Sequence, residues 1–302
     1  MLRERLLAGE PSLNACGVDR ARLVTAQAAH DGRAGRVERA ASIPLRLDGS
    51  HGALPARWYS PLLTRPTGAM LVYFHGGGFV TGDLDTHDDA CRELAHASGA
   101  GVLSVEYRLA PEHPFPAQLD DARAAFASAR RLAGTLGCDP LRVGVAGDSA
   151  GGNLAAAVAV AAADGIRPAC QLLIYPWLDM SLQEPSVATF GEGFGLLKEE
   201  LDWFRELWLG RAADPSASPS LREDLGDASP AHIVVAGFDP LRDEAERYAQ
   251  RLQLAGVPVT VQRHPGLVHG FVEFLGLSQA ARHAVTDMGT AVRGLLDRSP
   301  PD

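Results

Sequence analysis

The sequence 141-LRVGVAGDSAGGNLA-155 changes character at its centre. Residues 141–147 form a short apolar run, which is typical of a strand buried on both faces. The alanine-rich residues 153–163 favour a helix. Between the two, GDSAG (147–151) fits the pattern G-x-S-x-G, in which glycines permit a sharp turn from strand to helix and the serine Oγ faces outward. The stretch therefore predicts a strand, a tight turn carrying Ser149 and a helix.

The same alternation of strands and helices extends along most of the chain. Further strands are predicted at 37–47, 54–59, 69–75, 101–107, 170–176, 231–237 and 257–264. Helices are predicted around 91–94 and at 119–136, 243–254 and 278–297. Such alternation predicts an α/β fold with a mostly parallel central sheet and helices on both faces.

The alternation fails between Pro176 and Ser229, where the chain becomes rich in aromatic residues. We expect this insert, about 177–229, to form a helical cap together with residues 1–35, on a single domain that spans 1–302. The insert carries Phe190, Phe194, Trp203, Phe204 and Trp208. If its helices are amphipathic, roughly half of these rings point into a pocket and the rest pack inside the cap.

The composition excludes several classes of protein. The 302 residues are 46% hydrophobic and 22% charged, enough for a large core without disulfide or metal support. A net charge of −9 argues against nucleic acids and anionic membranes as partners. No apolar run is long enough to cross a membrane, no signal peptide is visible, and the four cysteines form no CxxC pair, so we expect a cytoplasmic protein.

A second glycine-rich motif, His75-Gly76-Gly77-Gly78, ends the strand predicted at 69–75. Consecutive glycines let backbone N–H groups turn toward one point, where a substrate oxygen can approach closely. The motif is typical of an oxyanion loop. We expect His75 to hold this loop in place rather than to transfer protons.

A nucleophilic serine needs a base and a carboxylate that orients the base. Asp239 follows the strand predicted at 231–237, at the carboxyl end where the active groups of parallel sheets gather. His269 lies in a loop beyond the strand predicted at 257–264. These two residues follow Ser149 in the order acid, then histidine, that this arrangement requires.

Other candidates for these roles are weaker. Asp243 and Glu244 lie inside the start of a predicted helix, and His264 still belongs to its strand. The remaining histidines lack a comparable context and are expected at the surface; examples are His51, His87, His96 and His283. No HExxH pattern or His/Cys cluster suggests a metal, and no G-x-G-x-x-G joins a strand to a helix, so no metal and no cofactor are predicted.

Six segments together resemble the bacterial hormone-sensitive-lipase-like (family IV) esterases of the α/β-hydrolase fold. They are HGGGFVTGDLDTHD (75–88), YRLAPEHPFPA (107–117), GDSAGGNLA (147–155), LIYPWLD (173–179), GFDPLRDE (237–244) and HGF (269–271). They occur in the family's order and extend from about residue 70 to residue 275. Their combination is far more specific than any one of them.

This resemblance implies a serine carboxylic ester hydrolase. By position in the motifs, the nucleophile would be Ser149, the triad acid Asp239 and the base His269, and the oxyanion donors would be the N–H groups of Gly77, Gly78 and Ala150. The form GDSAGG (147–152) is typical of the larger of two subgroups of the family. The chain departs from the family at His264, where a tyrosine is common.

The expected substrates are small-molecule esters with short to medium acyl chains, about four to eight carbons, because a compact cap encloses an apolar pocket. An amidase or an aryl-formamide hydrolase would use the same triad. A non-catalytic small-molecule receptor on this fold would have lost the base, whereas His269 is present. A dehydratase on this scaffold usually departs from HGGG at the oxyanion loop, whereas this sequence keeps all three glycines. The physiological ester does not follow from the sequence, which also leaves a homodimer open.

Overall fold

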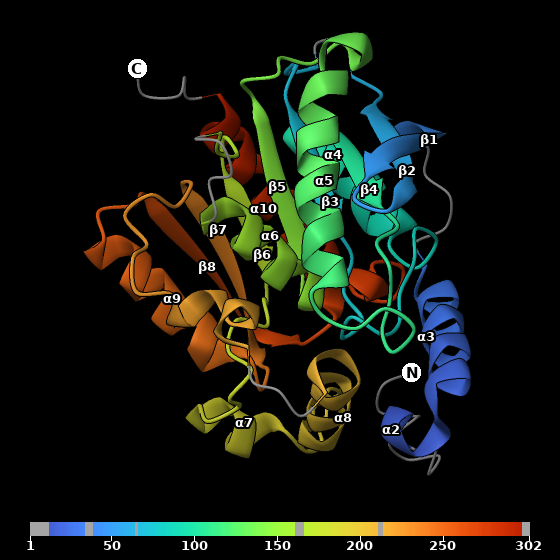
Figure 1. Cartoon of the computed structure of the whole chain (residues 1–302), viewed down its shortest axis with the longest axis vertical. Helices are drawn as coiled ribbons and strands as arrows, with labels where there is room; N and C mark the ends of the chain where they lie inside the picture. Colours follow the sequence, from blue (N-terminus) through green and yellow to red (C-terminus); the bar gives the residue numbers. More distant parts are fainter. Residues whose placement is uncertain (1–11, 34–38, 64–65, 161–165, 211–213, 298–302) are drawn as a thin grey trace.

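A single sheet organises the computed structural model, which describes residues 12–33, 39–63, 66–160, 166–210 and 214–297 (Figure 1). Within these residues, eight strands lie in the order β1-β2-β4-β3-β5-β6-β7-β8. The strands are β1 Ala40–Gly49, β2 Gly52–Pro61, β3 Met70–Phe74, β4 Gly101–Val105, β5 Val143–Asp148, β6 Gln171–Ile174, β7 Ala231–Phe238 and β8 Val259–Val268.

The sheet is antiparallel only where the chain begins. β1 and β2 form an antiparallel hairpin, and β2 pairs antiparallel with β4. From β4 to β8 every neighbouring pair is parallel. The central strands β3, β4, β5 and β6 are buried along their whole length, as expected for strands covered on both faces. The predicted α/β fold with a mostly parallel sheet is confirmed.

Helices cover both faces of the sheet and its lower end in Figure 1. They are α2 Leu13–Cys16, α3 Val18–Gly32, α4 Asp88–Ser98, α5 Ala117–Leu132, α6 Ala150–Val160, α7 Pro185–Phe190, α8 Lys198–Leu209, α9 Arg242–Leu254 and α10 Gln279–Leu296. One buried cluster joins α4 and α10 to the sheet, and a second joins α5, α6 and α9 to the opposite face. Among the described residues, no helix combines the length and the apolar character that crossing a membrane requires.

The last strand is longer than its sequence predicts. β8 continues to Val268, four residues beyond the expected end at His264, so the segment 265–268 is not a loop. The pairing with β7 passes from Ala236↔His264 to Phe238↔Val268, so the Pro-Gly pair is taken up as a bulge in the strand. A side chain at Gly237 would collide with the Pro265 carbonyl, which explains why glycine faces the bulge.

The strands and helices otherwise lie within a few residues of their predicted positions, and the opening strands meet in a turn at residues 50–51 rather than 48–50. Some predicted segments fall outside the described residues: 37–38 of the first strand, 161–163 of the helix after Ser149, and 1–11, 34–35 and 211–213 of the expected cap.

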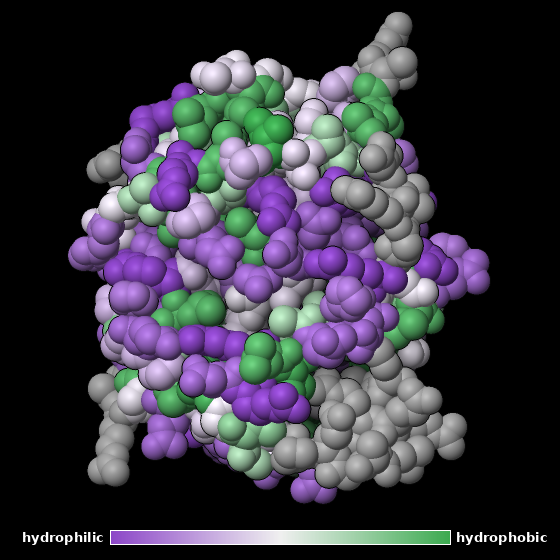
Figure 2. Space-filling view, turned by 90° about the vertical axis from the view of Figure 1, so that its right-hand side faces the viewer, coloured by the Kyte–Doolittle hydropathy of each residue, from purple (hydrophilic) through white to green (hydrophobic). Residues whose placement is uncertain are grey.

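Helices α7 and α8 of the insert lie at the end of the sheet where β5 and β7 finish, and α8 lies beside the N-terminal helix α2 (Figure 1). α8 contacts α2, and the Leu13 N–H donates a hydrogen bond to Glu200 Oε1 at 2.9 Å. Arg22 of α3 donates hydrogen bonds to the carbonyls of Val80 and Ala110. The side of the molecule that bears β1, β2 and α3 is largely hydrophilic, with separate hydrophobic patches (Figure 2).

Candidate active site

Ser149 occupies a strained turn between β5 and α6. Its φ of +52° is left-handed, a conformation that non-glycine residues rarely adopt. The turn closes so tightly that a side chain at Gly147 would collide with Gly151, and one at Gly151 would collide with the Phe74 carbonyl. The glycines of the motif are therefore required by the close approach of backbone segments. Only 8% of Ser149 is exposed, so other parts of the chain cover the serine, which sequence reasoning expects to be exposed.

Three side chains from separate strand ends meet at this turn. Asp239 directly follows β7 and is fully buried, and His269 directly follows β8. His269 Nε2 lies 2.9 Å from Ser149 Oγ, and His269 Nδ1 lies 2.8 Å from Asp239 Oδ2. The Leu241 N–H donates to the other oxygen, Asp239 Oδ1, at 2.8 Å and fixes the carboxylate. The structure thus brings together the three residues predicted to form a triad.

The competing residues lie elsewhere. Asp243 accepts a hydrogen bond from the Ser186 N–H, and buried Glu244 accepts from the Leu178 and Asp179 N–H groups. His264 is inside β8, where its Nε2 contacts the Gln262 side chain at 2.7 Å.

The electrostatics of His269 suit a general base that is held by an acid. Burial of the ring opposes protonation, but the charge of Asp239 and its hydrogen bond outweigh burial and raise the pKa of His269 above the ordinary 6.5. A raised pKa means that the imidazole binds a proton more tightly, which favours the cation that forms when it deprotonates a serine.

The pH profile should show this shift. We expect kcat/KM for a soluble ester to rise with pH through an apparent pKa above 6.5, because His269 accepts the serine proton only when it is neutral. Below that pKa the protonated ring is inactive, so activity falls in acid. The measurement is kcat/KM from about pH 5 to 9, with His264→Ala as a control that should keep the same acid limb. A flat profile across the acid side would contradict a histidine base.

The glycine motif forms a loop after β3, beside the turn that carries Ser149. Gly77, Gly78 and Phe79 have φ values of +109°, +62° and +64°, which turn the backbone sharply. Ala150 begins helix α6, immediately after Ser149. Within the described part of the chain, no group accepts a hydrogen bond from the N–H of Gly77, Gly78 or Ala150, so these donors are available to a substrate oxygen.

His75 supports the loop. Its Nδ1 lies 2.8 Å from the Gly76 carbonyl oxygen, and its ring stacks on Tyr107 at 4.2 Å between ring centres. Tyr107 OH also donates to the His75 carbonyl at 2.7 Å. Burial, with the nearby charge of His87, lowers the pKa of His75 to about 4. The ring is therefore neutral near pH 7. Its hydrogen bond goes to the Gly76 carbonyl and not to Ser149, which fits a residue that holds the loop in place.

Helix α8 packs directly on this loop. The Phe204 ring fills the space beside Gly78 so closely that a Cβ there would collide with it. Trp208, one turn later, stacks on Phe79 with 3.6 Å between ring centres and donates from Nε1 to Gln118 Oε1 at 3.0 Å. Trp208 is fully buried and serves as a packing residue.

Two other aromatic residues of the insert belong to a separate group. Phe190 and Phe194 pack edge to face, and Phe194 stacks on Phe238 at 5.2 Å. Arg242 lies over the Phe190 ring at 4.8 Å from its centre. Phe238 immediately precedes Asp239, and no motif in the sequence predicts its part in this group. The fifth ring, Trp203, is half-buried beside Phe204.

His87, expected at the surface, is buried, and so is His232 of β7; for both residues that expectation is wrong. The chain between the glycine motif and α4 turns inward beneath the loop, where His87 Nε2 lies 3.2 Å from Asp148 Oδ1. Its isolation in the sequence hides this role, although the motif 75–88 contains it. Within the described residues, the group His87, Asp148 and Glu273 is close enough to hold a metal ion, with ligand atoms within 4.8 Å of one another. The Asp148 carboxylate, however, is already hydrogen-bonded to the Tyr73 OH and the Gly76 N–H.

Comparison with known proteins shows the family of the chain. A family model described as the alpha/beta hydrolase fold matches residues 71–273. Carboxylic ester hydrolase LipN of Mycobacterium tuberculosis is 44% identical over 84% of this chain and 70% of its own length. Ethyl acetate hydrolase of Pseudomonas putida is 39% identical over 76% of this chain and 74% of its own. The structure of ester-hydrolase EH1AB1, from the metagenome of Lake Arreo, superposes with a TM-score of 0.88 at 39% identity and covers 96% of each chain.

Proposed function

We propose a catalytic mechanism for this chain, which belongs to the α/β-hydrolase family and is a carboxylic ester hydrolase of the hormone-sensitive-lipase-like group. In this proposal Ser149 is the nucleophile, His269 the base and Asp239 the acid that orients it. The observation that carries the proposal is the chain of contacts from Ser149 Oγ to His269 Nε2 at 2.9 Å and from His269 Nδ1 to Asp239 Oδ2 at 2.8 Å.

Acylation begins when His269 accepts the Ser149 proton and Oγ attacks the ester carbonyl. Asp239 holds the imidazole with Nε2 toward the serine and stabilises the imidazolium. The N–H groups of Gly77, Gly78 and Ala150 donate to the oxyanion that develops, and each is worth about 3–4 kcal/mol of the barrier. His269 then gives its proton to the departing alcohol.

Deacylation uses the same groups in reverse. Water enters where the alcohol left, His269 accepts its proton, and the resulting hydroxide attacks the acyl carbon of the Ser149 ester. The tetrahedral intermediate collapses, the acid leaves, and Ser149 recovers its proton. Every step is carried by side chains and backbone groups of this chain, so the proposed mechanism includes no cofactor and no metal ion.

We also propose that the insert 177–229 and residues 1–35 form a cap that limits the substrate to small esters. Two observations support an enclosed, apolar substrate pocket at Ser149. The serine is buried, and the Phe204 ring packs against Gly78 of the neighbouring loop. Two relatives are named for the esters that they cleave, ethyl acetate for one and aryl esters for the other. Membership of the GDSAGG subgroup, a cytoplasmic location, a homodimer and the lack of nucleic-acid partners remain parts of this proposal.

The substrate proposal predicts an optimum in acyl length. Across nitrophenyl esters from acetate to palmitate, kcat/KM should peak at about four to eight acyl carbons, because each methylene adds up to about 0.8 kcal/mol of binding until the pocket is full. Each ester is measured below and above its solubility limit. A maximum at long chains, or a rise in rate when droplets form, would contradict the proposal.

A matched set of nitroanilides with the same acyl groups tests the reaction class. An ester hydrolase should cleave the esters far faster than the corresponding anilides, because nitroaniline is a poorer leaving group than nitrophenolate. Comparable rates on both sets would favour an amidase that uses the same triad.

A further inference from the structure

We propose that His87 is a positioning residue for this ester hydrolysis: its ring fastens together the three segments that carry the catalytic groups. These segments are the glycine loop, the turn that bears Ser149, and the segment after His269. The inference rests on the proposed function, since it assigns a role relative to that active site.

The first link runs from the serine turn to the glycine loop. Asp148 immediately precedes Ser149, and its Oδ1 accepts hydrogen bonds from the Gly76 N–H at 2.9 Å and from the Tyr73 OH at 2.8 Å. A side chain at Gly76 would collide with Asp148 Oδ2, so the loop backbone rests directly on the carboxylate. The position of the proposed oxyanion donors relative to Ser149 thus depends on where this carboxylate is held.

His87 holds that carboxylate. Its Nε2 lies 3.2 Å from Asp148 Oδ1 and 3.3 Å from Oδ2, with both side chains almost completely inaccessible to solvent. Nε2 also lies 4.0 Å from Oε1 of Glu273. Glu273 belongs to the short 3₁₀ helix Phe271–Phe274, four residues after His269. One ring therefore bridges carboxylates from the serine turn and from the histidine segment.

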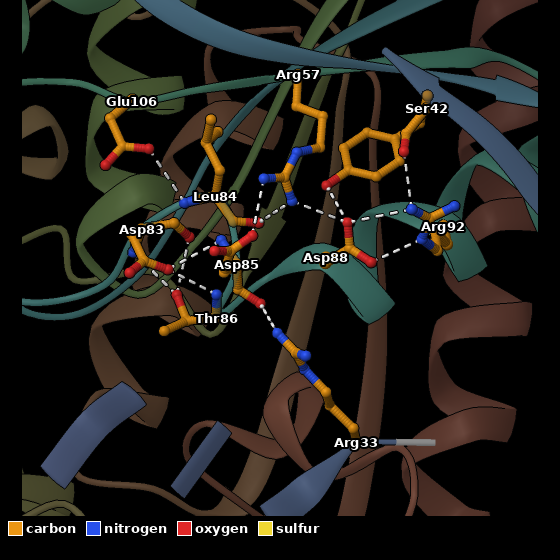
Figure 3. Close-up of polar contacts among 11 residues, drawn as sticks. Arg33, Ser42, Arg57, Asp83, Leu84, Asp85, Thr86, Asp88, Arg92 and Glu106 are labelled. Atoms are coloured by element: carbon orange, nitrogen blue, oxygen red, sulfur yellow. Dashed lines mark hydrogen bonds and ion pairs between the residues drawn. The ribbon is translucent and has the colours of Figure 1, made fainter. Parts of the chain in front are cut away.

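His87 lies in sequence between Thr86 and Asp88, whose polar contacts with Asp83 and Arg57 are drawn in Figure 3. Its Nδ1 lies 2.9 Å from Thr86 Oγ1, and the Thr86 N–H donates to Asp83 Oδ1. On either side of Thr86 and His87, the carboxylates of Asp85 and Asp88 accept hydrogen bonds from Arg57 of β2. The ring is thus anchored to the sheet independently of the three segments that it joins.

The charge of the ring strengthens the arrangement. Burial alone would lower the pKa of His87, but the Asp148 carboxylate, with Glu273, raises it to about 9. The imidazolium near pH 7 therefore compensates a buried carboxylate. Without it, Asp148 would be an uncompensated charge and would take up a proton or move, and either change alters its bond to Gly76.

The test compares His87→Leu and His87→Gln with wild type, using kcat per active site, where sites are counted by the burst on reaction with a fluorophosphonate. A second readout is the affinity for a trifluoromethyl ketone, whose hemiketal oxyanion occupies the oxyanion hole. We expect His87→Leu to lower kcat per titrated site by about 10–100-fold with KM within about twofold, because the donors are displaced rather than removed. Ketone affinity should fall in proportion, and glutamine, which can still donate to Asp148, should restore part of both.

His232→Gln is the matched control. His232 is also buried, in β7, but it contacts Thr260 and Gln262, away from the catalytic segments. This variant should keep wild-type kcat per titrated site. If His87→Leu does not fold, Glu273→Gln retains the ring and should still lower kcat about 3–10-fold.

The proposal is overturned if the folded His87 variants keep wild-type kcat per titrated site and wild-type ketone affinity. It is also overturned if wild type contains a tightly bound divalent metal whose removal by a chelator reproduces the His87→Leu defect. Failure of the proposed function has a different signature, since wild type would then show no burst and no labelling of Ser149, and both proposals would fall together.

Discussion

Replacement of Ser149 by alanine is expected to lower kcat by about 10⁴-fold or more. The variant removes the Oγ that lies 2.9 Å from His269 Nε2, and no acyl-enzyme can then form. The methyl group of alanine fits the left-handed turn as well as the serine Cβ does, so thermal unfolding should change little. The measurement is steady-state hydrolysis of a short nitrophenyl ester by protein purified free of host esterases.

Covalent labelling separates a lost nucleophile from a lost fold. Wild type should gain the mass of one fluorophosphonate adduct on Ser149 and lose its activity in parallel, whereas Ser149→Ala should gain none. If the variant keeps more than a few per cent of wild-type turnover, another group is the nucleophile and the mechanism above is wrong.

Replacement of His269 by alanine is expected to be comparably severe, again about 10⁴-fold in kcat, because the members of a triad act as a unit. Without the imidazole, Ser149 keeps its proton and Asp239 becomes a buried carboxylate with no histidine partner. The fall should appear in kcat more than in KM, since the ring acts on the reacting atoms. The same ester assay measures both parameters.

His264→Ala is the natural comparison for this second variant. His264 lies five residues earlier, within β8, is half-buried and contacts Gln262 rather than a catalytic group. It should keep most of the wild-type activity. The reverse outcome, with His264→Ala inactive and His269→Ala active, would show that His269 is not the base.

The parts of the site that could be predicted from sequence are those where one residue type is required locally. Gly147 and Gly151 flank Ser149 because nothing larger fits the turn, and this steric requirement is visible as a short motif. Asp239 and His269 can be predicted because each lies beyond the end of a predicted strand, and parallel strands end at the same edge of a sheet. The parallel sheet follows from the buried apolar runs, which need helices on both faces.

The parts that could not be predicted depend on contacts between distant segments. Nothing near His87 in the sequence shows that its ring meets Asp148, 61 residues later, so the sequence predicts a surface histidine where the structure has a buried one. The bulge at Pro265 becomes visible only through the pairing of β8 with β7, because in isolation a Pro-Gly pair indicates a turn. Likewise, which rings of the insert pack inward is decided by their partners, as with Trp208 on Phe79.

The contact of α8 with the glycine loop has a consequence for how substrate range can diverge. Phe204 and Trp208 belong to the segment expected to select substrates, yet they rest on Gly78 and Phe79 of the loop expected to stabilise the transition state. Substrate selectivity and catalytic rate therefore depend on the same packing contacts in this chain. A mutation in α8 that makes room for a bulkier ester should also shift the glycine loop, whose N–H groups are the proposed oxyanion donors. A chimera that carries α8 from a relative but keeps this glycine loop should have the same defect. Laboratory evolution of this chain toward larger substrates should proceed through paired changes in the two segments.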